Sequence, residues 1–238
     1  MLAIIGGSGF YQLGKKIEDI DVTTPYGITA FERVKLFKKE IVFLARHGKD
    51  HRYPPHMVNY RANIYALKKI GATAAFATHA CGILSKYTPG DIVMLTDFIG
   101  LGTPITFYDD FSAGMRHTDF TEPYNKELQD TIFACARYNK IPIKKDGIVV
   151  TTTGPRYETK AEVRHLKKTG ANLVSMTASY EATLMKEMEI PFAAIAICTN
   201  KATGLQKKQL NQEEILEVMS KTKLKISTLV NELSKEVE

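Results

Sequence analysis

Cysteine is scarce in this sequence, and its arrangement excludes two common kinds of small protein. The chain of 238 residues holds Cys81, Cys135 and Cys198, an odd number at uneven spacing and with no CxxC pair. Neither a disulfide framework nor a cysteine-based metal site can be built from that pattern. We expect reduced, buried thiols, which are typical of a cytoplasmic protein.

A long apolar run and a strongly basic segment are also missing. The N-terminal apolar run reaches glycine at position 6 and has no basic n-region, so it is too short for a signal peptide or a membrane span. The net charge is +6, but no basic run is interleaved with aromatic residues. We therefore expect no membrane and no nucleic-acid partner; the charge fits a solvated surface or attraction of an anionic substrate.

Three motif-based functions fail on spacing. The third glycine of a dinucleotide fingerprint would fall at Gln12, and no serine lies in a GxSxG elbow. The histidines at 47, 51 and 56 lack Cys, Asp or Glu partners at ligand spacing, so no metal is expected.

Apolar strand segments alternate with helical segments along most of the chain. We predict strands at 2–5, 74–78, 92–98, 148–153, 172–176 and 192–199, and a strand pair within 28–46. Helices are predicted at 57–70, 127–138, 159–169, from about 177, and from 212 onward, with a long loop at 99–121. The pattern favours one α/β domain, residues 1–238, with a mostly parallel or mixed central sheet flanked by helices.

The stretch 151–185 contains two successive turns from a strand into a helix. Thr159 and Glu162 form a capping box, which leaves Glu158 just before the helix and free to face a cleft. The next strand leads to Thr177 and Ser179 at another helix N-terminus, where free N–H groups favour an anion.

Polar residues follow the predicted strands at several points. Because ligands of open α/β sheets bind beyond the carboxyl ends of the strands, these residues are candidates for a shared site. Each of them alone could equally be an ordinary turn, loop or core residue. The candidates are Ser8, Arg46, His47, His79, Glu158, Thr177 and Asn200.

The motifs of the whole chain together resemble the trimeric nucleoside phosphorylase family, which includes purine nucleoside and methylthioadenosine phosphorylases. They occur in the family's order and cover nearly the whole chain. The matching segments are 6–9 (GGSG), 46–48 (RHG), 59–66 (NYRANIYA), 80–82 (ACG), 89–92 (PGDI), 107–109 (FYD), 154–159 (GPRYET), 176–177 (MT) and 199–200 (TN).

The resemblance implies a distorted central sheet and phosphorolysis, in which phosphate attacks C1′ of a nucleoside and releases the base. Phosphate contacts carry over to Ser8, Arg46, His47, the backbone N–H of Ala80, and Thr177. Met176 would pack on the ribose and Tyr157 near the base, with Glu158 and Asn200 reading the base. Asn200, Glu158 and His47 would be the catalytic residues.

The family also implies a homotrimer, or a dimer of trimers, with an aromatic residue from loop 107–111 reaching a neighbouring subunit. It implies no cofactor and no metal; inorganic phosphate is a co-substrate.

Glu158 and Asn200 favour a 6-oxopurine, because a carboxylate can accept from N1–H and an amide can donate to N7 or O6. A 6-aminopurine presents the reverse edge, and a buried mismatch of this kind discriminates strongly. The chain is therefore predicted to act on inosine, guanosine or methylthioinosine. A methylthioadenosine phosphorylase and a non-catalytic nucleoside-binding protein are the alternatives.

At three places the chain departs from the family pattern or leaves the substrate undecided. His79 stands where Thr or Asn is usual, Ser179-Tyr180-Glu181 replaces a commoner Val-Pro-Glu, and Gln212 leaves the 5′ substituent of the sugar open. Glu181 could be only a charge at a helix N-terminus. The choice between trimer and hexamer is also open.

Overall fold

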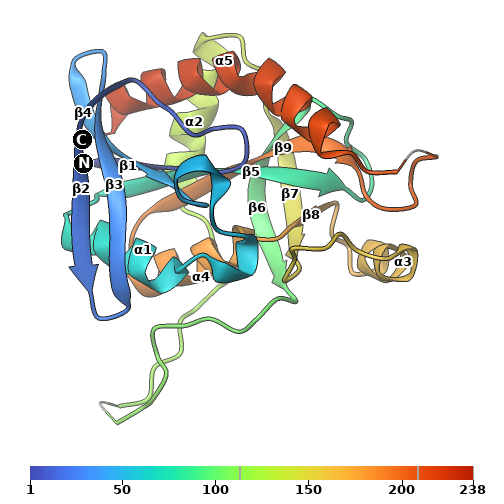
Figure 1. Cartoon of the computed structure of the whole chain (residues 1–238), viewed down its shortest axis with the longest axis horizontal. Helices are drawn as coiled ribbons and strands as arrows, with labels where there is room; N and C mark the ends of the chain where they lie inside the picture. The colour runs from blue at the N-terminus through green and yellow to red at the C-terminus, as the bar shows by residue number, and fades with distance from the viewer. Residues whose placement is uncertain (113, 208, 238) are drawn as a thin grey trace.

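Within residues 1–112, 114–207 and 209–237, which the computed structural model describes, nine strands form one mixed sheet (Figure 1). Their order across the sheet is β2-β3-β4-β1-β5-β8-β7-β6-β9. The strands are β1 (Leu2–Gly6), β2 (Lys15–Thr24), β3 (Gly27–Leu36), β4 (Lys39–Ala45), β5 (Ala74–Ile83), β6 (Ile92–Gly100), β7 (Lys144–Thr151), β8 (Leu173–Ser175) and β9 (Phe192–Lys201).

The sheet closes on itself at one end. Strand β9 pairs with β6 in antiparallel and with β5 in parallel, so β5, β8, β7, β6 and β9 form a ring. Both neighbours shield β9, and its first nine residues are buried. A strand buried on both faces reads as a continuous apolar run, which is why the sequence predicted this segment and the mixed sheet.

Helices cover both faces of the sheet, with α2 and α5 on one side and α1 and α4 on the other (Figure 1). Two large clusters of buried apolar side chains result, one under each helix pair, and a third, smaller cluster includes Val163 and Leu166. The helices are α1 (Tyr60–Lys69), α2 (Lys126–Tyr138), α3 (Lys160–Lys168), α4 (Ala178–Glu187) and α5 (Gln212–Glu236). The predicted α/β architecture is confirmed.

Two strands run further than predicted, which changes where polar residues lie. Strand β5 continues from the predicted end at 78 to Ile83, and β9 continues to Lys201. The two strands stay paired over this length, with a register shift between Cys81 and Gly82. His79 and Asn200 therefore lie within strands and not after them, because inter-strand hydrogen bonds sustain a strand that polar side chains seemed to end.

The sequence reading missed β2 and began α1 too early. Strand β2 is rich in charge, lies at the edge of the sheet beside β3, and exposes most of its side chains, so it carries little apolar signal. Pro55–Met57 form a short 3₁₀ turn (η2), and α1 begins after Asn59, whose side chain accepts from the N–H of Ala62. The capping box of α3 is confirmed in both of its hydrogen bonds.

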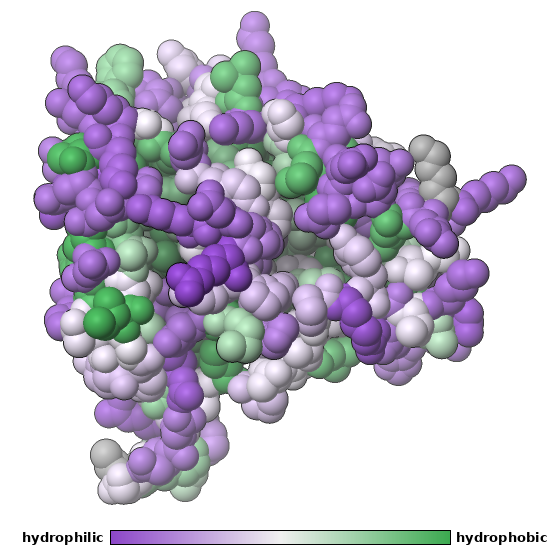
Figure 2. All heavy atoms as spheres, in the orientation of Figure 1, coloured by the Kyte–Doolittle hydropathy of each residue, from purple (hydrophilic) through white to green (hydrophobic). Residues whose placement is uncertain are grey.

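Hydrophilic side chains dominate the face shown in Figure 2, with apolar side chains scattered between them. None of the helices in the described ranges has both the length and the apolarity that crossing a membrane requires. The loop between β6 and α2 extends well away from the body of the molecule (Figure 1).

Candidate active site

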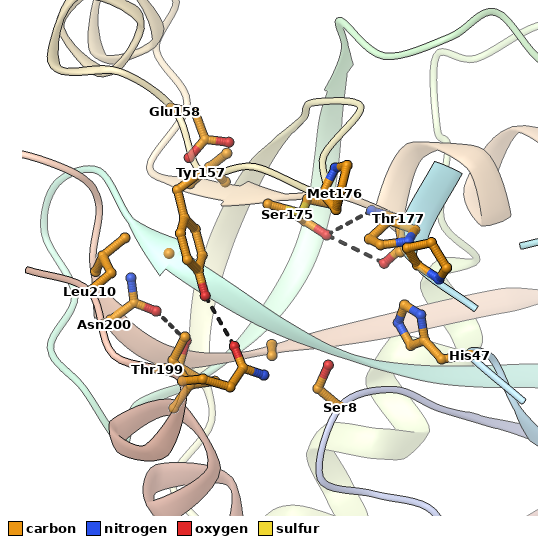
Figure 3. Close-up of a pocket in the computed structure, with 18 of the residues that line it drawn as sticks. Ser8, His47, Tyr157, Glu158, Ser175, Met176, Thr177, Thr199, Asn200 and Leu210 are labelled. Atoms are coloured by element: carbon orange, nitrogen blue, oxygen red, sulfur yellow. Dashed lines mark hydrogen bonds between the residues drawn. The ribbon is translucent and has the colours of Figure 1, made fainter. Parts of the chain in front are cut away.

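A pocket of about 380 Å³ gathers all nine residues that sequence analysis assigned to substrate contacts. They come from the ends of β1, β4 and β8, from within β5 and β9, and from the connection between β7 and α3. Figure 3 shows Ser8, His47 and Thr177 at one end of this pocket, with Tyr157, Glu158 and Asn200 toward the other. These two groups are called the anion end and the base end below.

A buried ion pair organises the anion end. The Arg46 guanidinium donates from Nε to Glu181 Oε1, and from Nη2 to Glu181 Oε2 at 2.7 Å. Arg46 is 3% exposed and Glu181 2%. The pair fixes the plane of the guanidinium, since bidentate carboxylate contacts restrict its geometry. Glu181 is therefore the buried ion-pair partner of Arg46. From the sequence alone, it could have been only a charge at a helix N-terminus.

The Arg46 guanidinium also has N–H groups that remain available to a ligand. Its Nη1 donates to the Thr78 carbonyl oxygen at 3.0 Å, so three of five N–H groups have partners among the described residues. The other two can bind an oxyanion in the pocket that Arg46 lines. A β-carbon on Gly7 would lie 2.4 Å from Nη1, so glycine is needed there for the guanidinium to fit.

His47 is held as a neutral imidazole. Its Nδ1 donates to the Tyr53 carbonyl oxygen at 2.8 Å, and its ring stacks on His51 with centroids 4.2 Å apart. Burial, reinforced by the positive charge of Arg46, lowers the pKa of His47 to about 3. With Nδ1 protonated and the ring neutral, Nε2 is an acceptor.

The N-terminus of α4 lies at the anion end as predicted, with Thr177 as its N-cap residue. Ser8 lies at the same end (Figure 3), and Ala80 also lines the pocket. Ser179 is different, because it is buried outside the pocket lining and its N–H donates to Thr151 Oγ1 at 3.0 Å. Ser179 therefore lies at the helix N-terminus as predicted but takes no part in the pocket lining.

The base end pairs an acid with an amide. Glu158, 6% exposed, accepts from Thr152 Oγ1 at 2.7 Å, which fixes one oxygen and leaves the other for a ligand. Asn200 accepts from Thr199 Oγ1 at 2.7 Å and donates to the Lys201 carbonyl oxygen at 3.0 Å. These contacts orient the amide, and its second N–H remains available as a donor.

Tyr157, at the base end, and Met176, which directly precedes Thr177, also line the pocket (Figure 3). The Tyr157 hydroxyl donates to Gln212 Oε1 at 3.3 Å, so a contact spans from the β7–α3 connection to the start of α5 (Figure 3). Met176 lies against Gly154, whose φ of +65° and lack of a side chain allow the close approach.

Sequence reasoning missed the apolar side chains that line part of the pocket. Leu210 and Ile215 come from the start of α5 and the segment before it, and Pro54 and Pro55 come from the segment after β4. Nothing in the local sequence distinguishes these residues from ordinary loop and core residues. They share a pocket only because the tertiary structure brings the start of α5 and the segment after β4 together.

Among the described residues, no group of three or more His, Cys, Asp or Glu side chains is placed to hold a metal ion. The anion end holds the Arg46 guanidinium and the Ser8 hydroxyl as donors. These suit an anionic ligand rather than a cation.

Comparisons with known proteins place the chain in a family. The Phosphorylase superfamily pattern matches residues 1–235. The chain is 40% identical to a 6-oxopurine nucleoside phosphorylase of Pyrococcus furiosus, over 96% of this chain and 90% of the relative. It is 36% identical to a probable S-methyl-5′-thioinosine phosphorylase of Methanopyrus kandleri, again over 96% and 90%.

A solved structure supports the same family assignment by its similar fold. The methylthioadenosine phosphorylase of Schistosoma mansoni in complex with adenine superposes with a TM-score of 0.90 at 30% identity, over 99% of this chain and 90% of that one. The sequence match, the similar fold and the pocket point the same way. The chain belongs to the phosphorylase superfamily.

Proposed function

We propose that this protein cleaves 6-oxopurine nucleosides with phosphate, releasing the free base and a ribose or methylthioribose 1-phosphate. The observation that carries the proposal is the pairing of Glu158 and Asn200 at one end of a pocket whose other end holds Arg46. Relatives named 6-oxopurine nucleoside phosphorylase and methylthioinosine phosphorylase support the same substrate class.

The chemistry requires two kinds of stabilisation. Phosphate must be held close to C1′, and negative charge on the departing purine must be neutralised. Arg46, Ser8, His47, Thr177 and the backbone N–H of Ala80 are proposed to bind phosphate.

The remaining pocket residues are proposed to bind the nucleoside. Asn200 donates its free N–H to the purine as the bond to C1′ breaks, and Glu158 accepts from N1–H. Met176 packs on the ribose, and Tyr157 lies near the base.

A methylthioadenosine phosphorylase is the second candidate, favoured by the structural similarity to the Schistosoma mansoni enzyme. A 6-aminopurine would bring its unprotonated N1 against Glu158. That contact puts two acceptors face to face in a buried site, which argues against this substrate.

Base release from a panel of nucleosides tests the function. The panel is inosine, guanosine, methylthioinosine, adenosine and methylthioadenosine, each with and without phosphate. We expect phosphate-dependent release confined to the three 6-oxopurines, and the ratio of methylthioinosine to inosine decides the 5′ substituent. Preference for methylthioadenosine would overturn the proposed specificity. No turnover with any nucleoside would overturn the proposed enzymatic activity.

Glu158→Gln tests the reader of the base. The amide can donate to an unprotonated N1, so we expect kcat/KM for inosine to fall about 10- to 100-fold and the adenosine-to-inosine ratio to rise. Glu217→Gln on the exposed face of α5 is the matched control. An unchanged substrate ratio in Glu158→Gln would remove Glu158 from base recognition.

We further propose a homotrimer or a dimer of trimers in the cytoplasm, without a resident cofactor. Phe107 packs on Tyr26 within its own chain, whereas Phe111 is 48% exposed and is the aromatic residue available to a neighbour. Three buried, unpaired cysteines fit a reducing compartment. Light scattering tests the oligomer, cell fractionation tests the location, and unchanged turnover after chelator dialysis tests the missing cofactor.

A further inference from the structure

His79 is a buried histidine directly behind the anion end of the pocket, and the roles proposed so far leave it unused. It is 1% exposed on β5. Its Nδ1 lies 2.9 Å from Thr177 Oγ1, and its Nε2 lies 3.4 Å from Glu181 Oε2. Within the described residues Nε2 makes no hydrogen bond, so the Glu181 carboxylate is the polar group it faces.

The surrounding charges decide which nitrogen carries the proton. Glu181 receives the Arg46 fork and can only accept, so a lone pair on Nε2 would be repelled by Oε2. The proton therefore belongs on Nε2. Burial, with the nearby Arg46 and His47, holds the pKa of His79 well below its usual range, so the ring is neutral and Nδ1 is an acceptor.

The tautomer of His79 fixes the direction of the Thr177 hydroxyl. With Nδ1 accepting, Thr177 Oγ1 is the donor of their 2.9 Å hydrogen bond, and its proton points away from the pocket. Toward a ligand Thr177 then offers only lone pairs. His47 lines the same end and also offers an acceptor, because its Nδ1 donates to Tyr53.

We propose that His79 is a specificity-determining residue of the anion site: by accepting the Thr177 hydroxyl proton, it makes the site select a phosphate that carries its own protons over a fully ionised tetrahedral anion. This inference rests on the phosphate-dependent activity proposed above. Arg46 and Ser8 supply donors for the unprotonated phosphate oxygens, while Thr177 and His47 accept from the P–OH groups.

Sulfate is the natural probe of this selection. Near neutral pH it has the shape of phosphate but no proton to donate, so it would place bare oxygens against Thr177 and His47. A buried polar contact left unmatched weakens binding by about 10- to 100-fold.

Calorimetric titration of the wild-type protein with phosphate and with sulfate is the first measurement. We expect sulfate to bind about 10- to 100-fold more weakly than phosphate at neutral pH. Above the second pKa of phosphate, phosphate binding should take up a proton and weaken about tenfold per pH unit. The opposite result would be a sulfate dissociation constant within about threefold of that for phosphate, together with uptake of a proton when sulfate binds. It would mean that a histidine becomes charged to match the anion, and it would overturn the proposal.

His79→Asn tests the residue itself. An asparagine amide can donate to Thr177 Oγ1 and release the hydroxyl proton toward the pocket. We expect phosphate and sulfate affinities to come within about threefold of each other in this variant. His165→Asn, on the exposed side of α3, is the matched control and should keep the wild-type ratio.

Two readouts keep the outcomes separate. Near-UV circular dichroism checks that His79→Asn is folded; if it is not, the wild-type anion ratio and proton uptake still decide the proposal. An unchanged ratio in a folded His79→Asn would overturn it. Phosphate-dependent turnover without anion selection would overturn this inference alone, whereas selective phosphate binding without turnover would overturn the proposed function alone.

Discussion

At position 7 a hydrogen atom stands where any other residue would carry a β-carbon, and the Arg46 guanidinium uses that space. An added β-carbon would lie 2.4 Å from Arg46 Nη1 and 3.0 Å from the Thr78 carbonyl oxygen. Gly7 is therefore required for the placement of Arg46. In the sequence the glycine run 6–9 is one of the segments that match the family, and the structure adds a steric reason for Gly7.

Replacing Gly7 with alanine is expected to displace the guanidinium and to weaken the anion end specifically. We expect Gly7→Ala to raise the KM for phosphate about 10- to 100-fold while the KM for the nucleoside changes little. Steady-state kinetics with each substrate varied in turn measures this. Gly100→Ala is the control, because its β-carbon would meet nothing closer than 3.7 Å. Equal changes in both KM values would contradict the assignment.

The Arg46–Glu181 pair predicts a large effect on stability. Glu181→Ala leaves the guanidinium buried without its counter-charge, so we expect the free energy of unfolding to fall by about 3–5 kcal/mol. Urea denaturation measures the loss. The matched control is Glu217→Ala, which breaks an exposed pair with Lys221 on α5 and should have no measurable effect. If the two variants were equally stable, the buried pair would have no structural role.

At the scale of elements, the β7–α3 connection shows how a local signal positions a functional group. The capping box of Thr159 and Glu162 fixes where α3 begins, so Glu158 stays outside the helix. The Thr152 hydroxyl then orients its carboxylate. Both features lie within a few residues of one another, which is why sequence alone located Glu158.

Thr159→Ala removes the side chain that accepts from the N–H of Glu162. We expect a loss of about 1 kcal/mol in the free energy of unfolding, the usual cost of an N-cap threonine. A modest rise in the KM for the nucleoside should accompany it, because Glu158 directly precedes the cap. Thr131→Ala, in the interior of α2, is the control: alanine is the better helix former there, so the free energy of unfolding should not fall, and the KM should not change. A stable variant with unaltered KM would show that the cap does not hold Glu158.

At the scale of the whole molecule, the buried neutral histidines couple folding to pH. The pKa of His47 is about 3 in the folded protein against an ordinary value of 6.5, so between these values the unfolded chain binds more protons. Its contribution to stability is complete above about pH 6.5 and is lost as the pH falls toward 3. His79 acts in the same direction.

Urea titrations at pH 7.5 and pH 5 measure this dependence. At about 1.4 kcal/mol per pH unit for each histidine, His47 alone should lower the free energy of unfolding by about 2 kcal/mol between these conditions. His47→Gln should remove that share, while His165→Gln on the surface should keep the wild-type slope. An identical slope in wild type and His47→Gln would show that His47 is not held neutral.

The sequence by itself determined what depends on local chemistry. The ordered motifs, the buried strands and the capping box of α3 were enough to predict the α/β fold, the family, and nine residues that line one pocket. Edge strand β2 was not predicted from the sequence because its charged residues give no apolar pattern.

Only the tertiary structure decided contacts between distant segments. Glu181 meets Arg46 from 135 residues away, and His79 meets Thr177 from 98. The sequence placed His47 and His79 after predicted strands and Glu181 near a helix N-terminus but could not say which would be buried, paired or neutral. Burial and charge pairing set those states, and both depend on how the tertiary structure brings the ends of β4 and β5 together with α4.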